Sequence, residues 1–150
     1  MTTCFYLDTS VYNRPFDDQT QPRIWLETLA LSLILQLIED NEAELITSTV
    51  VAYENSRNPH EMRRIWVNKV AQLASHNQPV DPTIRQRAAT LENEGLKAID
   101  ALHLACAEAA AADYFITCDD RLISRYQRLQ SSPAQLTVCN PTEFIRLIGA

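Results

Sequence analysis

Residues 4–8, with the sequence CFYLD, form a short apolar run that ends in a carboxylate. Residues 114–119 (YFITCD) repeat this arrangement near the other end of the chain. Short apolar stretches alternate with longer helical ones in between, as in a parallel sheet covered by helices on both faces. The sequence therefore predicts an α/β fold in which both acids lie at the carboxyl edge of the sheet, where such folds bind ligands.

The remaining elements follow the same alternation. Asp81 and Asn140 each precede a proline, which predicts a capped helix start, and Gly95 predicts a helix end. Residues 13–21 are expected to form a polar loop. We expect strands at residues 4–7, 45–47, 77–80, 114–117 and 136–139, and helices at 22–40, 61–75, 82–94 and 120–129, with three more that begin near 48, 100 and 141.

The composition is that of one globular domain. The chain has 150 residues, 46% of them hydrophobic, so residues 1–150 are expected to form a single domain with its own core. The four cysteines show no paired spacing and no secretory signal precedes them, which predicts reduced thiols and a cytoplasmic protein. The apolar stretch at residues 26–38 is too short to span a bilayer, so no membrane association is expected.

Several enzyme classes are excluded by missing motifs. With only two glycines, the chain has no Gly-rich loop for a nucleotide phosphate, which excludes Rossmann and P-loop sites. HExxH, GxSxG and CxxC are also absent, which removes common zinc and serine-nucleophile enzymes. The net charge of −6 argues against a general electrostatic grip on nucleic acid. It does not exclude nucleic acid, because a bound cation reverses the local sign of an acidic site.

Four acids at or just past the ends of hydrophobic segments are the candidate site: Asp8, Glu54, Asp100 and Asp119. Carboxylates that are forced together repel one another unless a cation neutralises them, and an all-oxygen cluster suits Mg²⁺ or Mn²⁺. Each acid also has an ordinary interpretation as a turn residue, a helix cap or a solvated helix residue. Their convergence at one sheet edge favours a metal-dependent hydrolase of phosphodiesters.

Four ordered motifs resemble those of PIN-domain ribonucleases, and most of all those of the VapC-type toxins of bacterial toxin–antitoxin modules. The motifs are residues 7–11 (LDTSV), 48–54 (STVVAYE), 99–105 (IDALHLA) and 115–119 (FITCD), which together cover essentially the whole chain. The resemblance implies a three-layer α/β/α sandwich around a parallel sheet of four or five strands. It also implies a Mg²⁺ or Mn²⁺ site, endonucleolytic cleavage of RNA, and a small antitoxin protein as a partner.

The resemblance also assigns the site residue by residue. Asp8, Glu54 and Asp100 match the three near-invariant acids of the family. Asp119 matches the fourth acid, and Thr117 matches the polar residue two positions earlier. Asp8, Asp100 and Asp119 would then hold the metal, with Glu54 as a further ligand or as the base that positions water. Water as the nucleophile would leave a 5′-phosphate and a 3′-hydroxyl, and RNA as the substrate rests on the resemblance alone.

Some neighbouring residues keep more than one interpretation. Asp119 is favoured as the fourth acid, with Asp120 as the helix cap or a group further from the metal. His103 lies one turn after Asp100, but its leucine-rich context favours a structural histidine. Three basic residues share one helix face, where they contact either RNA phosphates or only solvent: Arg121, Arg125 and Arg128.

Proteins of other classes remain as alternatives. A catalytically silent PIN-like domain that binds RNA or protein is the main one, although such a scaffold has no need to retain four like charges. Receiver domains and phosphatases also use acids at strand ends. The chain lacks the adjacent acid pair that a receiver requires and the DxDxT pattern of the phosphatases.

The helix expected at residues 22–40 is more apolar than one core-facing stripe requires. The excess predicts either a homodimer interface or a groove for a partner helix. Packing between layers of the same domain is the alternative. Leu33 and Leu37, which are one turn apart, are both expected on the covered face.

Overall fold

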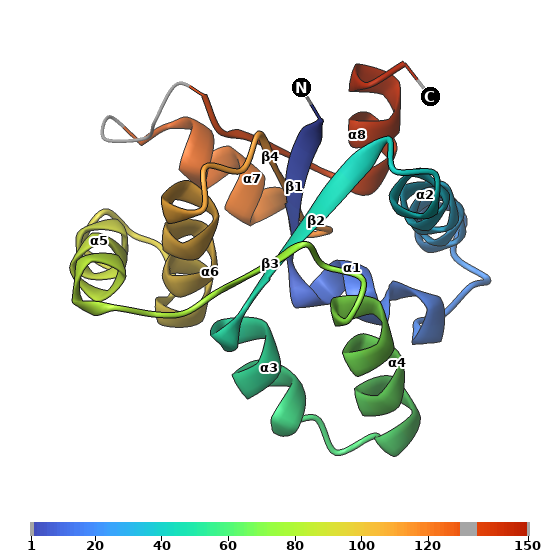
Figure 1. The fold of residues 1–150 in the computed structure, drawn as a ribbon, viewed down its shortest axis with the longest axis horizontal. Coiled ribbons are helices and arrows are strands. Elements are labelled where there is room, and N and C mark those ends of the chain that lie inside the picture. Colours follow the sequence, from blue (N-terminus) through green and yellow to red (C-terminus); the bar gives the residue numbers. More distant parts are fainter. Residues whose placement is uncertain (1, 130–134, 150) are drawn as a thin grey trace.

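Figure 1 shows the computed structural model, in which residues 2–129 and 135–149 are described. Its five strands form one sheet in the order β3-β2-β1-β4-β5, and every neighbouring pair is parallel. The parallel sheet predicted from the sequence is therefore confirmed. The strands are β1 (Thr3–Leu7), β2 (Ala43–Ser48), β3 (His76–Gln78), β4 (Tyr114–Ile116) and β5 (Thr137–Cys139).

Helices cover both faces of this sheet, which gives the expected three-layer α/β/α sandwich. In Figure 1, α2 and α8 lie on one side of the strands, and α5 and α6 lie on the other. The helices are α1 (Thr9–Asn13), the 3-10 helix η1 (Arg14–Phe16), α2 (Pro22–Glu39), α3 (Thr49–Ser56), α4 (Glu61–Ala71), α5 (Pro82–Asn93), α6 (Ala98–Ala109), α7 (Asp120–Gln127) and α8 (Pro141–Leu147).

The central strand β1 brings the ends of distant segments together. Phe5, Tyr6 and Leu7 are fully buried, because helices cover both faces of the strand. Leu7 pairs with Ile116 of β4, and the backbone N–H of Asp8 donates to the Ile116 carbonyl at 2.9 Å. Since the strands are parallel, the residues that follow β1 and β4 meet at one edge of the sheet.

Three predicted helix boundaries are confirmed by their capping contacts. The Asp81 carboxylate accepts from the backbone N–H of Ile84 at 2.8 Å, and the Asn140 side chain caps α8 in the same way. Gly95 follows α5 with a φ of 109°, a left-handed conformation that favours glycine. The end of α4 differs from expectation, because this helix stops at Ala71 and not at residue 75.

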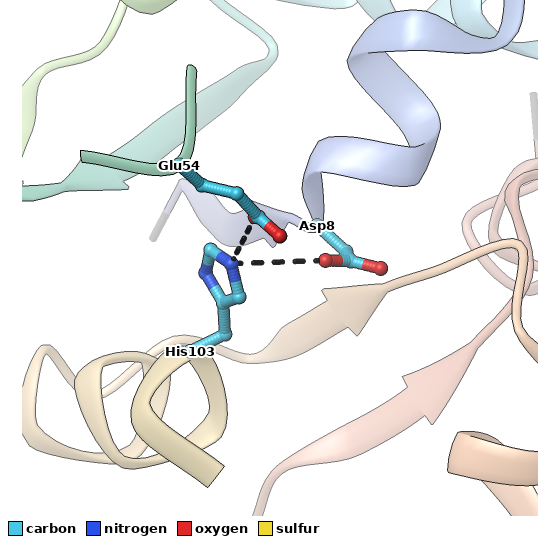
Figure 2. A group of neighbouring side chains, drawn as sticks. All are labelled: Asp8, Glu54 and His103. Atoms are coloured by element: carbon cyan, nitrogen blue, oxygen red, sulfur yellow. Dashed lines mark hydrogen bonds and ion pairs between the residues drawn. The ribbon is translucent and has the colours of Figure 1, made fainter. Parts of the chain in front are cut away.

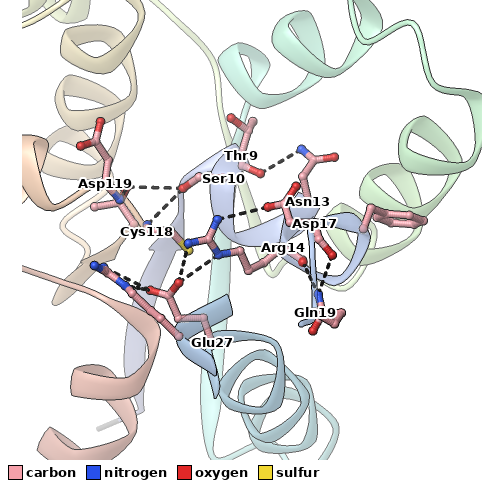
Figure 3. A network of polar contacts seen from close by, with 12 residues as sticks. Thr9, Ser10, Asn13, Arg14, Asp17, Gln19, Glu27, Cys118 and Asp119 are labelled. Carbon is pink, nitrogen blue, oxygen red and sulfur yellow. Dashed lines mark hydrogen bonds and ion pairs between the residues drawn. The ribbon is translucent and has the colours of Figure 1, made fainter. Parts of the chain in front are cut away.

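The prediction of a polar loop at residues 13–21 is wrong for its first part, where α1 ends at Asn13 and η1 follows. Figure 3 shows the cause: the Arg14 guanidinium donates from Nε and Nη2 to Oε1 of Glu27, at 2.9 and 2.7 Å. Glu27 is only 1% exposed. A buried charge needs such a partner, so the pair fixes η1 against α2.

Helix α2 buries one face and leaves a second apolar face exposed. Its buried residues include Ile24, Glu27, Leu31 and Ile34. Leu37 follows Leu33 by one turn and packs partly buried against the core, whereas Leu33 is exposed. We call the exposed residues the α2 row: Trp25, Leu26, Leu29 and Leu33, which are 42–51% exposed.

Two further predictions from the sequence concern the state of the cysteines and membrane association. All four cysteines are free thiols, as expected, and three of them are buried. Within residues 2–129 and 135–149, no helix has the length and apolar character needed to cross a bilayer.

The cap of α5 gives the first testable prediction. Replacing Asp81 with alanine removes the acceptor of the Ile84 N–H, which should lower the free energy of unfolding by about 1 kcal/mol. Thr83→Ala, at an exposed position of the same helix turn, is the matched control and should change it by less than about 0.5 kcal/mol. Urea denaturation measures both, and equal effects of the two substitutions would contradict the capping role.

Candidate functional site

Three side chains from separate elements converge at the carboxyl edge of the sheet (Figure 2). Asp8 directly follows β1, Glu54 lies on α3, and His103 lies on α6. One potential ligand atom from each of the three lies within 4.8 Å of the others. The structure thus brings together two of the predicted acids and adds a histidine that the sequence favoured only as structural.

The carboxylate of Asp8 is held by two hydroxyl groups. Ser10 Oγ and Thr117 Oγ1 each donate to Oδ2 of Asp8, both at 2.8 Å. Asp8 is 7% exposed, so these bonds replace water on that oxygen. Thr117, predicted as a polar neighbour of the acids, therefore lies in direct contact with Asp8.

Glu54 is held on one of its oxygens as well. Oε1 of Glu54 accepts from Thr9 Oγ1 at 2.6 Å and pairs with His103 Nε2 at 2.8 Å. Burial raises the pKa of Glu54, but the hydrogen bonds from His103 and Thr9 outweigh it and leave this pKa below its usual value. Glu54 is therefore ionised at neutral pH.

Asp100 shows the electrostatic strain that gathered carboxylates produce. It lies in the first turn of α6 and is half-buried. Burial, followed by the charges of Asp8 and Asp119, raises the pKa of Asp100 to about 6. The charges of the predicted acids Asp8 and Asp119 thus reach Asp100, although Asp100 and Asp119 lie outside the close group of Asp8, Glu54 and His103.

The two consecutive aspartates at the start of α7, Asp119 and Asp120, have different roles. Oδ1 of Asp119 accepts from the backbone N–H groups of Arg121 and Leu122, so Asp119 is the N-cap of α7. The expectation that Asp120 is the cap is wrong. Asp120 is exposed and pairs with Arg23 of α2 at 2.7 Å, because its side chain points out of the first turn. Only the Asp119 charge reaches the site.

The predicted basic residues lie on the surface of α7. Arg121, Arg125 and Arg128 are all exposed. Arg121 follows Asp119 by two residues, and its guanidinium makes no hydrogen bond or ion pair with any described residue. A hollow of about 250 Å³ borders the site at Glu54. Its lining is polar: Thr9, Asn13, Glu54, Asn55, Arg57 and Asn58.

Comparisons with known proteins show the family and the fold. The family model of the PIN domain matches residues 5–129. The chain belongs to the PIN domain family. PIN domains are generally nucleases, so the hydrolase class predicted from the sequence is supported.

Two solved structures share the fold of this PIN domain at low sequence identity. VapBC2 from Rickettsia felis, whose structure was solved with a DNA fragment from its promoter, is 13% identical with a TM-score of 0.57 and covers 92% of this chain and 98% of its own. PAE2754 from Pyrobaculum aerophilum is 15% identical with a TM-score of 0.53, and the alignment spans 100% of both chains. Comparison by sequence with curated proteins found no match.

The residues of this PIN domain fit a hard divalent cation. Asp8 and Glu54 offer carboxylate oxygens in a mostly buried setting, and Asp100 carries a raised pKa beside them. Oxygen ligands of this kind suit Mg²⁺ or Mn²⁺, and a positive charge at this place would relieve the repulsion between the acids.

The raised pKa of Asp100 predicts how stability depends on pH. An aspartate in the unfolded chain has a pKa of about 3.9, so between about pH 4 and pH 7 the folded protein binds more protons. The contribution of Asp100 to the free energy of unfolding, measured as the difference between wild type and Asp100→Asn, should therefore fall as pH rises, by roughly 1–2 kcal/mol after solvent screening of a half-exposed group. Denaturation of metal-free wild type and Asp100→Asn across this pH range measures that difference. Parallel pH profiles for the two proteins would rule out the repulsion.

Proposed function

We propose that the chain is a Mg²⁺- or Mn²⁺-dependent endoribonuclease that hydrolyses RNA phosphodiesters at the acidic site. The proposal is supported most by the gathering of acids from separate elements at one edge of the sheet, where the charges of Asp8 and Asp119 raise the pKa of Asp100, because perturbed carboxylates cluster at functional sites. Membership of a family of nucleases supplies the reaction class. RNA as the substrate rests on the resemblance to VapC-type toxins.

The acids of such a site would have two roles, cation binding and orientation of the attacking water. Asp8, Asp100 and Asp119 would hold the cation, and Glu54 would serve as a further ligand or orient the attacking water. When bound, the ion supplies an acidified water and neutralises charge that develops on the phosphate. Thr117 and Ser10 keep the Asp8 carboxylate in one orientation, which lowers the reorganisation needed during the reaction.

Surface residues near the acids offer contacts for the RNA backbone. Arg121 lies two residues after Asp119, and its guanidinium pairs with no residue in the described part of the chain. Asp120, between them in sequence, is neutralised by Arg23. Arg57 lines the polar hollow next to Glu54. Arg57 beside Glu54 and Arg121 two residues after Asp119 would contact the phosphates of an RNA chain, despite the net charge of −6.

The catalytic prediction uses substitutions that keep the shape of the side chain. Asp8→Asn and Asp100→Asn should each lower the rate of Mg²⁺- or Mn²⁺-dependent RNA cleavage at least about a hundredfold, while circular dichroism stays unchanged. Glu92→Gln, on the exposed face of α5, should cleave like the wild type.

Gel assays with the purified protein and structured RNA, with and without EDTA, measure these rates. A wild type that binds RNA but does not cut it with either metal would support the catalytically silent module instead. Full activity in both aspartate variants would also refute the assigned site.

We further propose that the α2 row is covered by a second copy of the chain or by a small antitoxin protein in the cytoplasm. Four large apolar side chains stand exposed on one helix face: Trp25, Leu26, Leu29 and Leu33. An exposed apolar patch of this kind marks an interaction surface. The resemblance to VapC-type toxins supplies the antitoxin as an expected partner.

Two substitutions one turn apart separate the interface from the core. Leu33→Glu places a charge on the exposed row, so it should dissociate the assembly and leave the monomer folded. Leu37→Glu places the same charge against the core and should lower the free energy of unfolding by about 2–4 kcal/mol. Light scattering and thermal unfolding measure both effects. A wild type that stays monomeric at high concentration and binds no partner would refute the interface.

A further inference from the structure

A continuous chain of hydrogen bonds links the start of α3 to the candidate site. Ser48 Oγ lies 2.6 Å from the Tyr6 hydroxyl, which lies 2.7 Å from Nδ1 of His103. Nε2 of His103 lies 2.8 Å from Oε1 of Glu54. Tyr6, Ser48 and His103 are each at most 1% exposed, so no bulk water competes and the groups themselves decide which of them donates.

The helix cap sets the direction of this chain. Ser48 Oγ accepts from the backbone N–H groups of Val50 and Val51, at 3.2 and 3.3 Å. Both of its lone pairs are then in use, which leaves its own proton to be donated. Of its two side-chain partners, the Tyr6 hydroxyl is a stronger acceptor than the Cys106 thiol, so the proton goes to Tyr6. Tyr6 accepts that bond and donates its proton to Nδ1 of His103. An imidazole nitrogen that accepts is unprotonated, so the ring proton lies on Nε2 and points at Glu54.

In this arrangement, Glu54 and Asp8 each have one carboxylate oxygen that accepts no hydrogen bond from a described residue. On Glu54, both His103 Nε2 and Thr9 Oγ1 donate to Oε1, and Oε2 accepts from no described residue. On Asp8, both hydroxyl donors bind Oδ2, and His103 Nε2 is 3.9 Å from Oδ1. Mg²⁺ holds near-ideal octahedral geometry, which suits one oxygen from each carboxylate.

We propose that His103 is a positioning residue: its Nε2–H, fixed by Tyr6 and Ser48, holds Oε1 of Glu54 so that Oε2 faces the cation. His103 is then a hydrogen-bond donor and not a metal ligand, although its ring is near enough to serve as one. This role rests on the proposed metal-dependent function, because it concerns how the site presents its oxygens.

The ring nitrogens of His103 report this arrangement directly. Nitrogen-15 NMR of the labelled protein should show one neutral ring protonated on Nε2, both without metal and with saturating Mg²⁺. The His103→Gln spectrum identifies the signal, and the exposed His60 ring is the internal control. A proton on Nδ1, or loss of the Nε2 proton when Mg²⁺ is added, would overturn the proposal.

Variants separate positioning from simple packing. Tyr6→Phe removes only the hydroxyl, since the ring that stacks on Phe115 at 5.4 Å remains. We expect His103 to lose its single tautomer and kcat to fall about tenfold, with KM for RNA within about twofold. An unchanged tautomer in Tyr6→Phe would show that the hydroxyl does not orient the ring.

The second pair of variants tests the donor itself. His103→Leu has no donor for Glu54 and should weaken Mn²⁺ binding about 10–100-fold, measured by calorimetry. His103→Gln can donate an amide N–H and should recover at least about half of that loss on a logarithmic scale. His60→Gln is the matched surface control. Equal Mn²⁺ affinity in the leucine and glutamine variants, both folded by circular dichroism, would contradict the positioning role.

These measurements also keep this proposal apart from the nuclease proposal. If the wild type cleaves no RNA, the proposed function fails, whereas the ring spectrum and the Mn²⁺ titrations still decide the role of His103. If the wild type cleaves RNA but Nε2 carries no proton, the nuclease stands and the positioning role fails.

Discussion

A carboxylate at the buried end of the central strand is the constraint on which the rest of the structure depends. Asp8 must follow β1, and β1 is covered on both faces, so the charge of Asp8 is largely removed from water. Such a charge destabilises the fold unless other groups offset it. Ser10 and Thr117 satisfy one of its oxygens, and the second, which accepts no hydrogen bond from a described residue, is where the proposed cation would bind. The position of Asp8 at the end of β1 thus determines both which groups must stabilise its charge and where a cation would bind.

The segment after β1 is organised around the same acid. Helix α1 begins directly after Asp8, and its first two residues supply hydroxyl donors to two of the site acids: Thr9 to Glu54 and Ser10 to Asp8. The buried pair of Arg14 and Glu27 then fixes the following turn against α2. The pair of Arg14 and Glu27 thus anchors the C-terminal end of α1, and this helps to hold the hydroxyl donors Thr9 and Ser10 in place.

Most of the fold could be predicted from short-range sequence patterns. The apolar runs, the caps at Asp81 and Asn140, and the stop at Gly95 depend on neighbours within a few residues, so the sequence predicts them. Contacts between distant residues were not visible. The partners of His103 are 49 and 97 residues away, and the role of Asp120 depends on Arg23, also 97 residues away. The site acids could be proposed in advance, but the hydrogen bonds that orient them could not.

The most direct test is anomalous diffraction from crystals soaked with Mn²⁺. The central claim is that the acids form one cation site with His103 outside the coordination sphere. We predict an anomalous peak bound by Oδ1 of Asp8 and by the carboxylates of Asp100 and Asp119, with Oε2 of Glu54 facing it and Nε2 of His103 beyond bonding distance. A saturated crystal without a peak among these acids, or a peak bound by His103, would contradict the account.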